Sequence, residues 1–424
     1  MMIKEVRKNI ILKSGTLYLD FTASGLGYKP IEKRIQSILA TYANTHSEVG
    51  ENAKKTTIAY NEARESLRES LEIGDNFYII PCGTGATSAI KKFQELMGLY
   101  IPPATKKRYK INPDKNSLPL VIVGPFEHHS NEVSFREALC EVIRIPTNSD
   151  ETIDLLHLED VLKQNKGREI FGSFAVASNV TGIINPIEKI YTIMKKYDGT
   201  VCLDAAASSP YMNVNSSYYD AMFLSPHKLI GGPGSCGLLI INKKLCACNE
   251  VPTFAGGGTV SYVSRYSHKF IDNIELTEDA GTPGILQFIK ASLAYKLRNE
   301  IGFDFIKGQE EKLKQVFKEE YVNVENIKLY CKKSHNKLAI FSFNIEGINP
   351  YDLAQKLSDK YNIQTRAGCS CAGPYGHDLL GYKENHDFKQ KPGWLRVGFH
   401  YTHTGDDVRY FFDALKKSMK SIVQ

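Results

Sequence analysis

The sequence predicts an α/β protein with a mostly parallel central sheet flanked by helices, followed by a smaller α+β domain at the C-terminus. Between about residues 55 and 245, short apolar runs bounded by turn residues alternate with longer amphipathic stretches. From about residue 283 this alternation gives way to a long helical pattern. The 424 residues also exceed the size at which a single core usually stops growing. We therefore expect an N-terminal segment 1–30 packing on the small domain, a large domain 31–290 and a small domain 291–424.

The elements follow from hydrophobic periodicity. The expected strands of the central sheet are Asn76–Ile80, Leu120–Val123, Val142–Ile145, Ile170–Ala175, Thr200–Leu203, Ala221–Leu224 and Cys236–Ile241. The expected helices between them are Thr56–Glu72, Gly85–Met97, Leu156–Gln164 and Pro186–Lys196. Ligands bind such sheets beyond the carboxyl ends of the strands, and the residues that fall there are Gly83, Glu127, Asn179, Asp204 and Ser225.

The C-terminal part has a different rhythm. The elements expected there are a helix Pro283–Glu300, a strand Leu338–Phe343, a helix Pro350–Tyr361 and a terminal helix from Thr404 onward. The segment Leu99–Pro119 is rich in Pro, Lys and Asn, which favours a surface insertion. Its basic cluster 106–110 is expected to be a solvated loop, because no interleaved aromatic residues point to nucleic acid.

Composition is that of an ordinary globular protein. Hydrophobic residues make up 42% and charged residues 24% of the chain, with a formal net charge of +6. The nine cysteines are odd in number and scattered, which favours a reducing compartment over a disulfide framework. Residues 1–8 carry a charge every few positions and no long apolar core. We therefore expect a cytoplasmic protein that binds neither nucleic acid nor membrane.

One lysine stands out by its position. Lys228 lies between an apolar run that enters the core and the glycine-rich turn of the segment LSPHKLIGGPGSCG at 224–237. Burial would lower the pKa of its amine and leave it nucleophilic at neutral pH, as a covalent anchor for a carbonyl cofactor requires. Taken alone, the segment fits an ordinary surface lysine equally well.

Other polar residues lie near the ends of expected strands. Asp204 ends the run 201–203, where an acid can pair with a protonated pyridine nitrogen or cap a helix. His128 follows the strand Leu120–Val123, where a flat imidazole can stack on a ring, although a structural role is the commoner one. The run PCGTGATS at 81–88 follows a strand and opens a helix, so its backbone N–H groups could hold a phosphate or simply form a tight turn.

The C-terminal part contributes two further motifs. Cys369 and Cys371 lie one residue apart in a glycine-rich loop, a pattern open to core packing, redox pairing or metal binding. Metal binding would need a distant pair such as Cys246 and Cys248, and we expect no metal. Arg396 lies in the apolar strand 394–399 and needs an anion, either a substrate carboxylate or an internal acid.

In this order, the motifs resemble the cysteine desulfurase and selenocysteine lyase branch of the class V aminotransferase family, pyridoxal 5′-phosphate (PLP) enzymes of fold type I. The resemblance covers nearly the whole chain. Besides the segments above, it includes LYLDFTAS at 17–24, YANTH at 42–46, ASNVTG at 177–182, GGG at 256–258 and DAGTP at 279–283.

The resemblance implies roles for individual residues. Lys228 would bind the PLP aldehyde, Asp204 its pyridine nitrogen and His128 its ring face. The phosphate and remaining cofactor contacts would come from Thr84, Gly85, Ser225 and His227, and from Thr282 of a neighbouring subunit, which implies a homodimer. Asn179 would contact the cofactor and would also bind the substrate together with Arg396, with Arg366 as a helper. In the family pattern Arg-x-Gly-x-x-Cys-Ala, Cys371 takes the persulfide-forming position.

Two positions depart from the family. Ala207 stands where the family's Asp-x-Ala-Gln run has Gln, and the loop at 82–86 reads CGTGA where desulfurases commonly have an Arg-Gly-Thr-Thr-Glu type run. The implied reaction is sulfur or selenium removal from an L-cysteine-type substrate to give alanine, with a sulfur-acceptor protein as a further candidate partner.

Three other functions compete with this one. An aminotransferase, carbon–sulfur lyase or epimerase would need Lys228 but no thiol. A noncatalytic scaffold or sulfur-carrier subunit would retain the fold without the cofactor. A nucleotide-binding oxidoreductase would rest on residues 83–85 alone, and the glycine spacing there argues against it.

Overall fold

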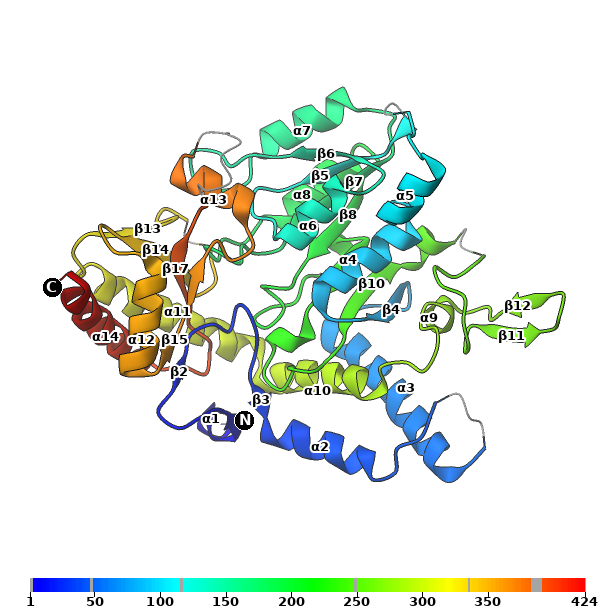
Figure 1. The fold of residues 1–424 in the computed structure, drawn as a ribbon, viewed down its shortest axis with the longest axis horizontal. Helices are drawn as coiled ribbons and strands as arrows, with labels where there is room; N and C mark the ends of the chain where they lie inside the picture. The colour runs from blue at the N-terminus through cyan, green and yellow to red at the C-terminus, as the bar shows by residue number, and fades with distance from the viewer. Residues whose placement is uncertain are drawn as a thin grey trace.

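The structure is a computed structural model that describes residues 3–45, 49–114, 117–247, 250–334, 336–382 and 391–423. Its main feature is a seven-stranded sheet in the order β4-β10-β9-β8-β7-β5-β6 (Figure 1). The strands are β4 (Phe77–Cys82), β5 (Leu120–Val123), β6 (Glu141–Arg144), β7 (Ile170–Ala175), β8 (Thr200–Asp204), β9 (Ala221–Leu224) and β10 (Gly237–Asn242). All seven expected strands are present, with ends that differ from the prediction by at most two residues.

The sheet is parallel except for one strand. Strands β5 to β9 pair in parallel, whereas β10 is antiparallel to both β9 and β4. The connection from β9 to β10 contains no crossover helix, and a return without a crossover requires antiparallel pairing. The prediction of a mostly parallel sheet is thus confirmed, and the short return keeps Lys228 at one end of β9.

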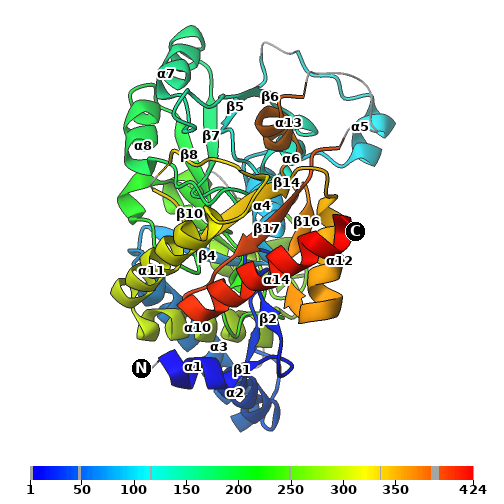
Figure 2. The ribbon, with the colours of Figure 1, turned by 90° about the vertical axis from the view of Figure 1, so that its left-hand side faces the viewer.

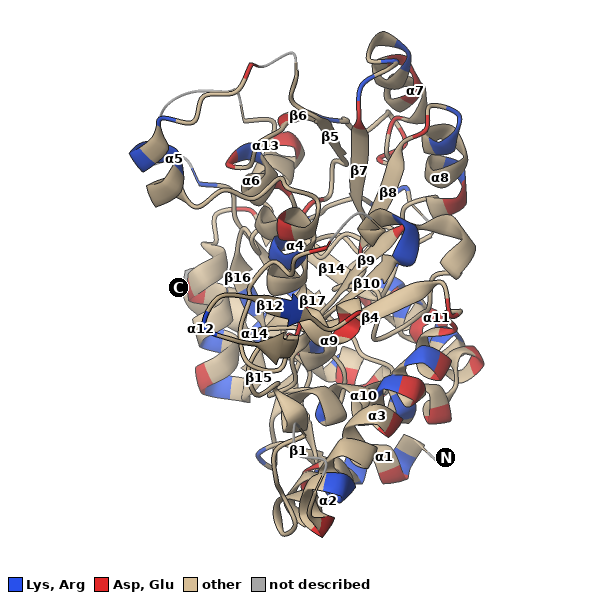
Figure 3. Ribbon diagram, turned by 90° about the vertical axis from the view of Figure 1, so that its right-hand side faces the viewer, with Lys and Arg blue, Asp and Glu red and all other residues tan. Residues whose placement is uncertain are grey.

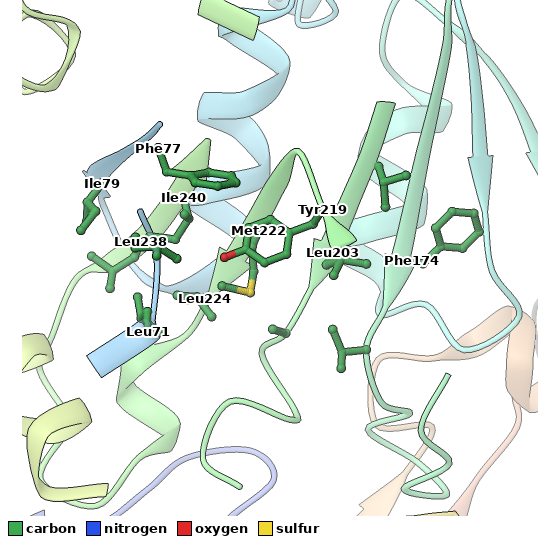
Figure 4. Close-up of a cluster of buried hydrophobic side chains, with 14 of the residues drawn as sticks. Leu71, Phe77, Ile79, Phe174, Leu203, Tyr219, Met222, Leu224, Leu238 and Ile240 are labelled. Atoms are coloured by element: carbon green, nitrogen blue, oxygen red, sulfur yellow. The ribbon is translucent and has the colours of Figure 1, made fainter. Parts of the chain in front are cut away.

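The two faces of the sheet bury different side chains. Alternate residues of a strand point to opposite faces, so Val201 and Leu203 of β8 enter one apolar cluster and Cys202 enters another. Figure 4 shows part of the first cluster, in which Leu203, Met222, Leu224 and Leu238 from three neighbouring strands lie together. This core fixes the strand ends that carry the polar residues.

Helices cover both faces of the sheet. They are α3 (Glu51–Leu71), α4 (Gly85–Leu96), α6 (His129–Arg136), α7 (Leu155–Gln164), α8 (Ile187–Lys195) and α10 (Ile285–Ile301). Most match the expected ranges, but α3 begins five residues before the expected Thr56. The residues from Glu51 to Lys55 carry three charges and offer little apolar periodicity, which is why the pattern missed this turn.

A second sheet lies at the end of the molecule that holds the C-terminus (Figures 1 and 2). Its order is β13-β14-β17-β16, with strands β13 (Ile327–Leu329), β14 (Ile340–Ile345), β16 (Arg366–Gly368) and β17 (Trp394–Gly398). The helices α11 (Phe303–Tyr321), α12 (Pro350–Tyr361) and α14 (Gly405–Val423) accompany it. These elements bury an apolar cluster of their own, built around Phe317, Phe341 and Leu395.

The N-terminal segment contacts this second sheet region. Leu17 and Tyr18 of β2 (Leu17–Tyr18) pair in parallel with β15 (Ile363–Gln364), and Asp20 bridges to Gly398. Arg7 forms an ion pair of 2.8 Å with Asp407 at the start of α14. The N-terminal segment thus contacts β15, β17 and α14, and the predicted division into segment 1–30 and domains 31–290 and 291–424 stays a prediction.

The insertion between α4 and β5 differs from the prediction. Its basic cluster lies in a short helix, α5 (Pro103–Tyr109), with no buried residue, rather than in a loop. Lys and Arg are good helix formers, and Pro103 can start a helix because its missing N–H would be unpaired there. Figure 3 shows both charge signs along the outer helices α8 and α11, whereas α5 carries only basic residues.

Among the described residues, no helix is long and apolar enough to cross a membrane.

Truncation of a central-sheet side chain tests this fold. Leu203 is fully buried between neighbouring strands, so Leu203→Ala removes packing and leaves a cavity. We expect the free energy of unfolding to fall by about 2–5 kcal/mol. Leu156→Ala, at a position that is 79% exposed, is the matched control and should change it little. Urea unfolding compares the two variants, and equal midpoints would contradict the assignment of Leu203 to the core.

Candidate active site

Polar residues from both sheets meet around a cavity of about 330 Å³. The carboxyl ends of β7, β8 and β9 contribute Ala175, Asp204 and Ser225, and the loop after β16 contributes Ser370 and Cys371. Sequence-predicted site residues that line it are Thr84, Gly85, His128, Asn179, Asp204, Ser225, His227, Lys228, Arg366, Cys371 and Arg396. Residues as far apart in the sequence as Thr84 and Arg396 therefore share one cavity.

Lys228 is the nucleophile candidate of this cavity. It ends the short 3₁₀ turn Pro226–Lys228 that follows β9, and its backbone N–H donates to the Ser225 carbonyl at 3.0 Å. Burial lowers the pKa of its amine to about 8, with Arg396 adding to the decrease and Asp204 opposing it. A substantial neutral fraction therefore exists near neutral pH, as nucleophilic attack on a carbonyl requires.

Asp204 closes the cavity at the end of β8. Its side chain is buried, and its Oδ1 accepts the Ala206 N–H at 2.9 Å. Burial raises the pKa of the carboxyl, against the opposing effects of that hydrogen bond and of Lys228. Ala207, at the position where the family has Gln, also lines the cavity and offers no hydrogen-bond donor there.

A cradle for an anion lies at the start of α4. Thr84, Gly85 and Ala86 at the start of this helix line the cavity, so its positive end faces the cavity. The Thr84 side chain forms no capping hydrogen bond. The Ala86 N–H donates to Ser225 Oγ at 2.9 Å, which ties the helix start to the turn of Lys228. Gly85 has φ +64°, and a Cβ there would lie 2.6 Å from the His227 ring. Gly85 therefore leaves the room and the backbone conformation that a phosphate cradle needs.

His128 caps the other helix that reaches the cavity. It precedes α6, and its Nδ1 accepts the Ser130 N–H at 3.1 Å. Burial and the charge of Lys228 lower the pKa of His128 to about 4. The same two effects lower the pKa of His227 to about 4. Both rings are therefore neutral near pH 7 and can stack or accept hydrogen bonds without adding charge.

Arg396 has the internal acid that the sequence left open as an alternative. Its Nη2 pairs with Asp20 Oδ1 at 2.6 Å, and its Nη1 donates to the Asn179 carbonyl at 2.9 Å. Burial lowers the pKa of the guanidinium, with Asp20 opposing the decrease. Among the described residues, Arg396 Nε and Asn179 Oδ1 are buried without a hydrogen-bond partner. Arg396 is thus both ion-paired and able to contact a ligand.

The two neighbouring cysteines differ in place. Cys371 lines the cavity, whereas Cys369 packs in an apolar cluster with Trp394 and Tyr375. No group of metal-ligating side chains occurs in the part of the chain that the structure describes. Cys248, the other half of the alternative metal pair, lies outside the described residues, as does His46 of the segment 42–46.

Thr282 lies away from the cavity of its own chain. It is exposed, and its Oγ1 accepts a hydrogen bond of 3.0 Å from Asn44 Nδ2. Its expected role in a neighbouring subunit stays a prediction.

Two carboxylates near the cavity, the buried Glu127 and the partly buried Asp20, have no role assigned from the sequence. Glu127 accepts the Ala175 N–H at 2.9 Å and the Asn131 amide at 2.5 Å, and burial raises its pKa to about 8. Glu127 follows the carboxyl end of β5, and this position could have indicated a site residue from the sequence. No sequence pattern indicated Asp20 as the partner of Arg396, because the two residues lie 376 positions apart.

Known proteins resemble this chain along nearly its whole length. The sequence pattern of the family described as Aminotransferase class-V matches residues 17–411. The chain belongs to the class V aminotransferase family. It is 30% identical to a probable cysteine desulfurase of Pyrococcus abyssi, over 99% of this chain and 98% of the relative. A probable cysteine desulfurase of Halobacterium salinarum is 26% identical over 92% of this chain and 89% of the relative.

Solved structures of cysteine desulfurases share the fold of this family member. An apo structure from Thermococcus onnurineus matches with a TM-score of 0.82 and 24% identity, covering 99% of this chain and 98% of that one. A structure from Escherichia coli matches with a TM-score of 0.78 and 21% identity, covering 99% of both chains. The predicted fold type I and the predicted resemblance to the family are therefore confirmed.

The pKa of Lys228 predicts how its reaction depends on pH. Only the neutral amine attacks an aldehyde, so labelling of Lys228 by salicylaldehyde with borohydride trapping should be half-maximal near pH 8, not 10.5. Asp204 favours the charged amine, so Asp204→Asn should move that midpoint to lower pH. Peptide mass spectrometry from pH 6 to 10 measures both, with the total labelling of other lysines as the control. A midpoint near that of an ordinary lysine would contradict the assigned desolvation.

Proposed function

We propose that the protein is a PLP-dependent cysteine desulfurase that takes sulfur, or selenium, from an L-cysteine-type substrate and releases alanine. One observation carries the proposal: Lys228, with its lowered pKa, and the thiol of Cys371 line the same cavity. An aminotransferase or an epimerase has no use for a thiol at this place. The names of the relatives from Pyrococcus abyssi and Halobacterium salinarum support the same reaction.

The cavity fits the proposed cofactor. The cradle at Gly85 would hold its phosphate, together with the hydroxyls of Thr84 and Ser225 and the His227 ring. Lys228 would attach to its aldehyde, Asp204 would hold a proton on its ring nitrogen, and His128 would cover its ring. When bound, PLP stabilises negative charge at the carbon next to the substrate amino group.

The chain's own residues would then bind and deprotonate the substrate. Arg396 would bind the carboxylate, sharing its guanidinium between the substrate and Asp20, and Asn179 would offer its buried amide. The neutral amine of Lys228, once displaced by the substrate amine, would take the proton from the Cα atom. A pKa near 8 suits an amine that must accept and return a proton near neutral pH.

Cys371 would receive the sulfur. Its thiolate would attack the substrate sulfur and form the sulfur–sulfur bond of a persulfide as the carbon–sulfur bond breaks. The electron pair of the broken bond stays with the carbon fragment, which takes up protons and leaves as alanine. A thiol reductant, or a sulfur-acceptor protein, would then remove the sulfur and regenerate the Cys371 thiol.

The assembly and compartment belong to the same proposal. Thr282 is exposed on this chain, which leaves it free to reach the phosphate cradle of a partner in a homodimer. Its contact with Asn44 would orient the hydroxyl there. We place the enzyme in the cytoplasm, where cysteines stay reduced.

Replacement of each neighbouring cysteine tests the proposal. Cys371→Ser should abolish persulfide-dependent sulfide release from L-cysteine in the presence of dithiothreitol, because a hydroxyl cannot accept the sulfur. Cys369→Ser is the matched control and should retain most of the rate, because Cys369 packs away from the cavity. Sulfide release and alanine formation measure both variants.

The products also separate the competing chemistries. Full activity of Cys371→Ser, or pyruvate or a keto acid in place of alanine, would refute the desulfurase assignment.

A further inference from the structure

The backbone that carries Cys371 has an unusual conformation. Ser370 has φ +53° and Cys371 has φ +58°, so two consecutive residues with side chains adopt the left-handed region. Each such residue costs about 1 kcal/mol or more relative to an ordinary conformation. A turn of this kind persists only where its surroundings hold it, so the contacts of the turn decide where the Cys371 thiol lies.

The turn is closed by its own hydrogen bond, from the Ala372 N–H to the Cys369 carbonyl at 3.0 Å, and three further hydrogen bonds to residues of other elements hold it. Asn179 Nδ2 donates to the Ser370 carbonyl at 2.7 Å. The backbone N–H of His129 donates to the Cys371 carbonyl at 2.7 Å. The backbone N–H of Gly373 in turn donates to the side-chain Nε2 of His129 at 2.8 Å. His129 thus holds the chain at Cys371 through its backbone and at Gly373, two residues later, through its ring.

His129 lies at the start of α6, beside the residues that line the cavity. It is the first residue of α6, directly after His128, and the two rings lie 6.3 Å apart. His128 lines the cavity, whereas the His129 ring faces Gly373. A Cβ on Gly373 would lie 3.0 Å from His129 Nε2, so the close approach depends on glycine at that position. The dipeptide therefore links the cavity of the main sheet to the turn that carries the thiol.

The His129 ring must be neutral to accept this hydrogen bond. Burial lowers its pKa, Glu132 opposes the decrease and Arg136 adds to it. Glu132 is itself paired with Arg136 and approached by Arg144 at 3.8 Å, which leaves it a limited effect on the ring. Near neutral pH the ring is therefore available as an acceptor.

We infer that His129 is a positioning residue, whose ring holds the turn of Cys371 in place over the cavity that contains Lys228. The inference rests on the proposed function of Cys371, but the hold on the turn can be measured without turnover. Its loss should free the turn to leave its strained conformation, which exposes the thiol and moves it away from a substrate bound at Lys228.

The test compares His129→Ala with His129→Gln, whose amide oxygen can accept the Gly373 N–H in place of Nε2. The first readout is the rate at which iodoacetamide alkylates Cys371 in the PLP-loaded protein without substrate, followed by peptide mass spectrometry. We expect His129→Ala to speed alkylation about fivefold, the effect of one lost hydrogen bond, and His129→Gln to restore most of the protection. Borohydride trapping at Lys228 should be equal in all three proteins.

The second readout is steady-state alanine formation. We expect His129→Ala to lower kcat about fivefold with little change in KM, because substrate binding at Lys228 and Arg396 is left intact. Alkylation and kcat equal to wild type in His129→Ala would overturn the inference. Equal defects in His129→Ala and His129→Gln would also overturn it, because the acceptor would then not be what matters. Absence of alanine with the wild-type protein would refute the proposed function instead and leave the alkylation result standing.

Discussion

The desolvation of the Lys228 amine is the constraint on which the rest of this structure depends. An ammonium ion loses its hydration when it is buried, and this loss lowers the pKa of Lys228 to about 8. The largest opposing effect comes from Asp204, which is itself buried and has a raised pKa. The pair leaves a substantial uncharged fraction of the amine near neutral pH, with the acid close by. Covalent capture of a carbonyl compound needs this balance.

The cavity around that amine is built by two separate cores. The parallel sheet supplies the cradle, His128 and Asp204, whereas the smaller sheet supplies Cys371 and Arg396. The hydrogen bond from Arg396 to the Asn179 carbonyl joins the two parts at the cavity wall, and the ion pair with Asp20 ties Arg396 to the N-terminal segment. Arg396, the residue proposed to bind the substrate carboxylate, therefore also contributes to how the two parts meet. The turn that carries Cys371 in the smaller part and Lys228 in the larger part therefore line the same cavity.

The sequence allowed most of the central sheet and most cavity residues to be predicted, because both follow from local patterns. The runs before Asp204 and Ser225 are short, apolar and bounded by turns, so their ends are visible in the sequence. The pairing of Asp20 with Arg396 was not predictable, because it joins segments that lie 376 positions apart. The reversed direction of β10 was not predicted, although the connection from β9 without a crossover helix requires it. The helix α5 was missed because solvation alone does not distinguish an exposed helix from a loop.

The proposed reaction requires Lys228 and Cys371 to act on one substrate molecule. The most direct measurement is mass spectrometry of the PLP-loaded protein after one equivalent of L-cysteine, without reductant and after rapid alkylation. We expect one added sulfur atom on the peptide that contains Cys371, with alanine formed in equal amount. Alanine without sulfur on that peptide, or sulfur on another cysteine, would contradict it.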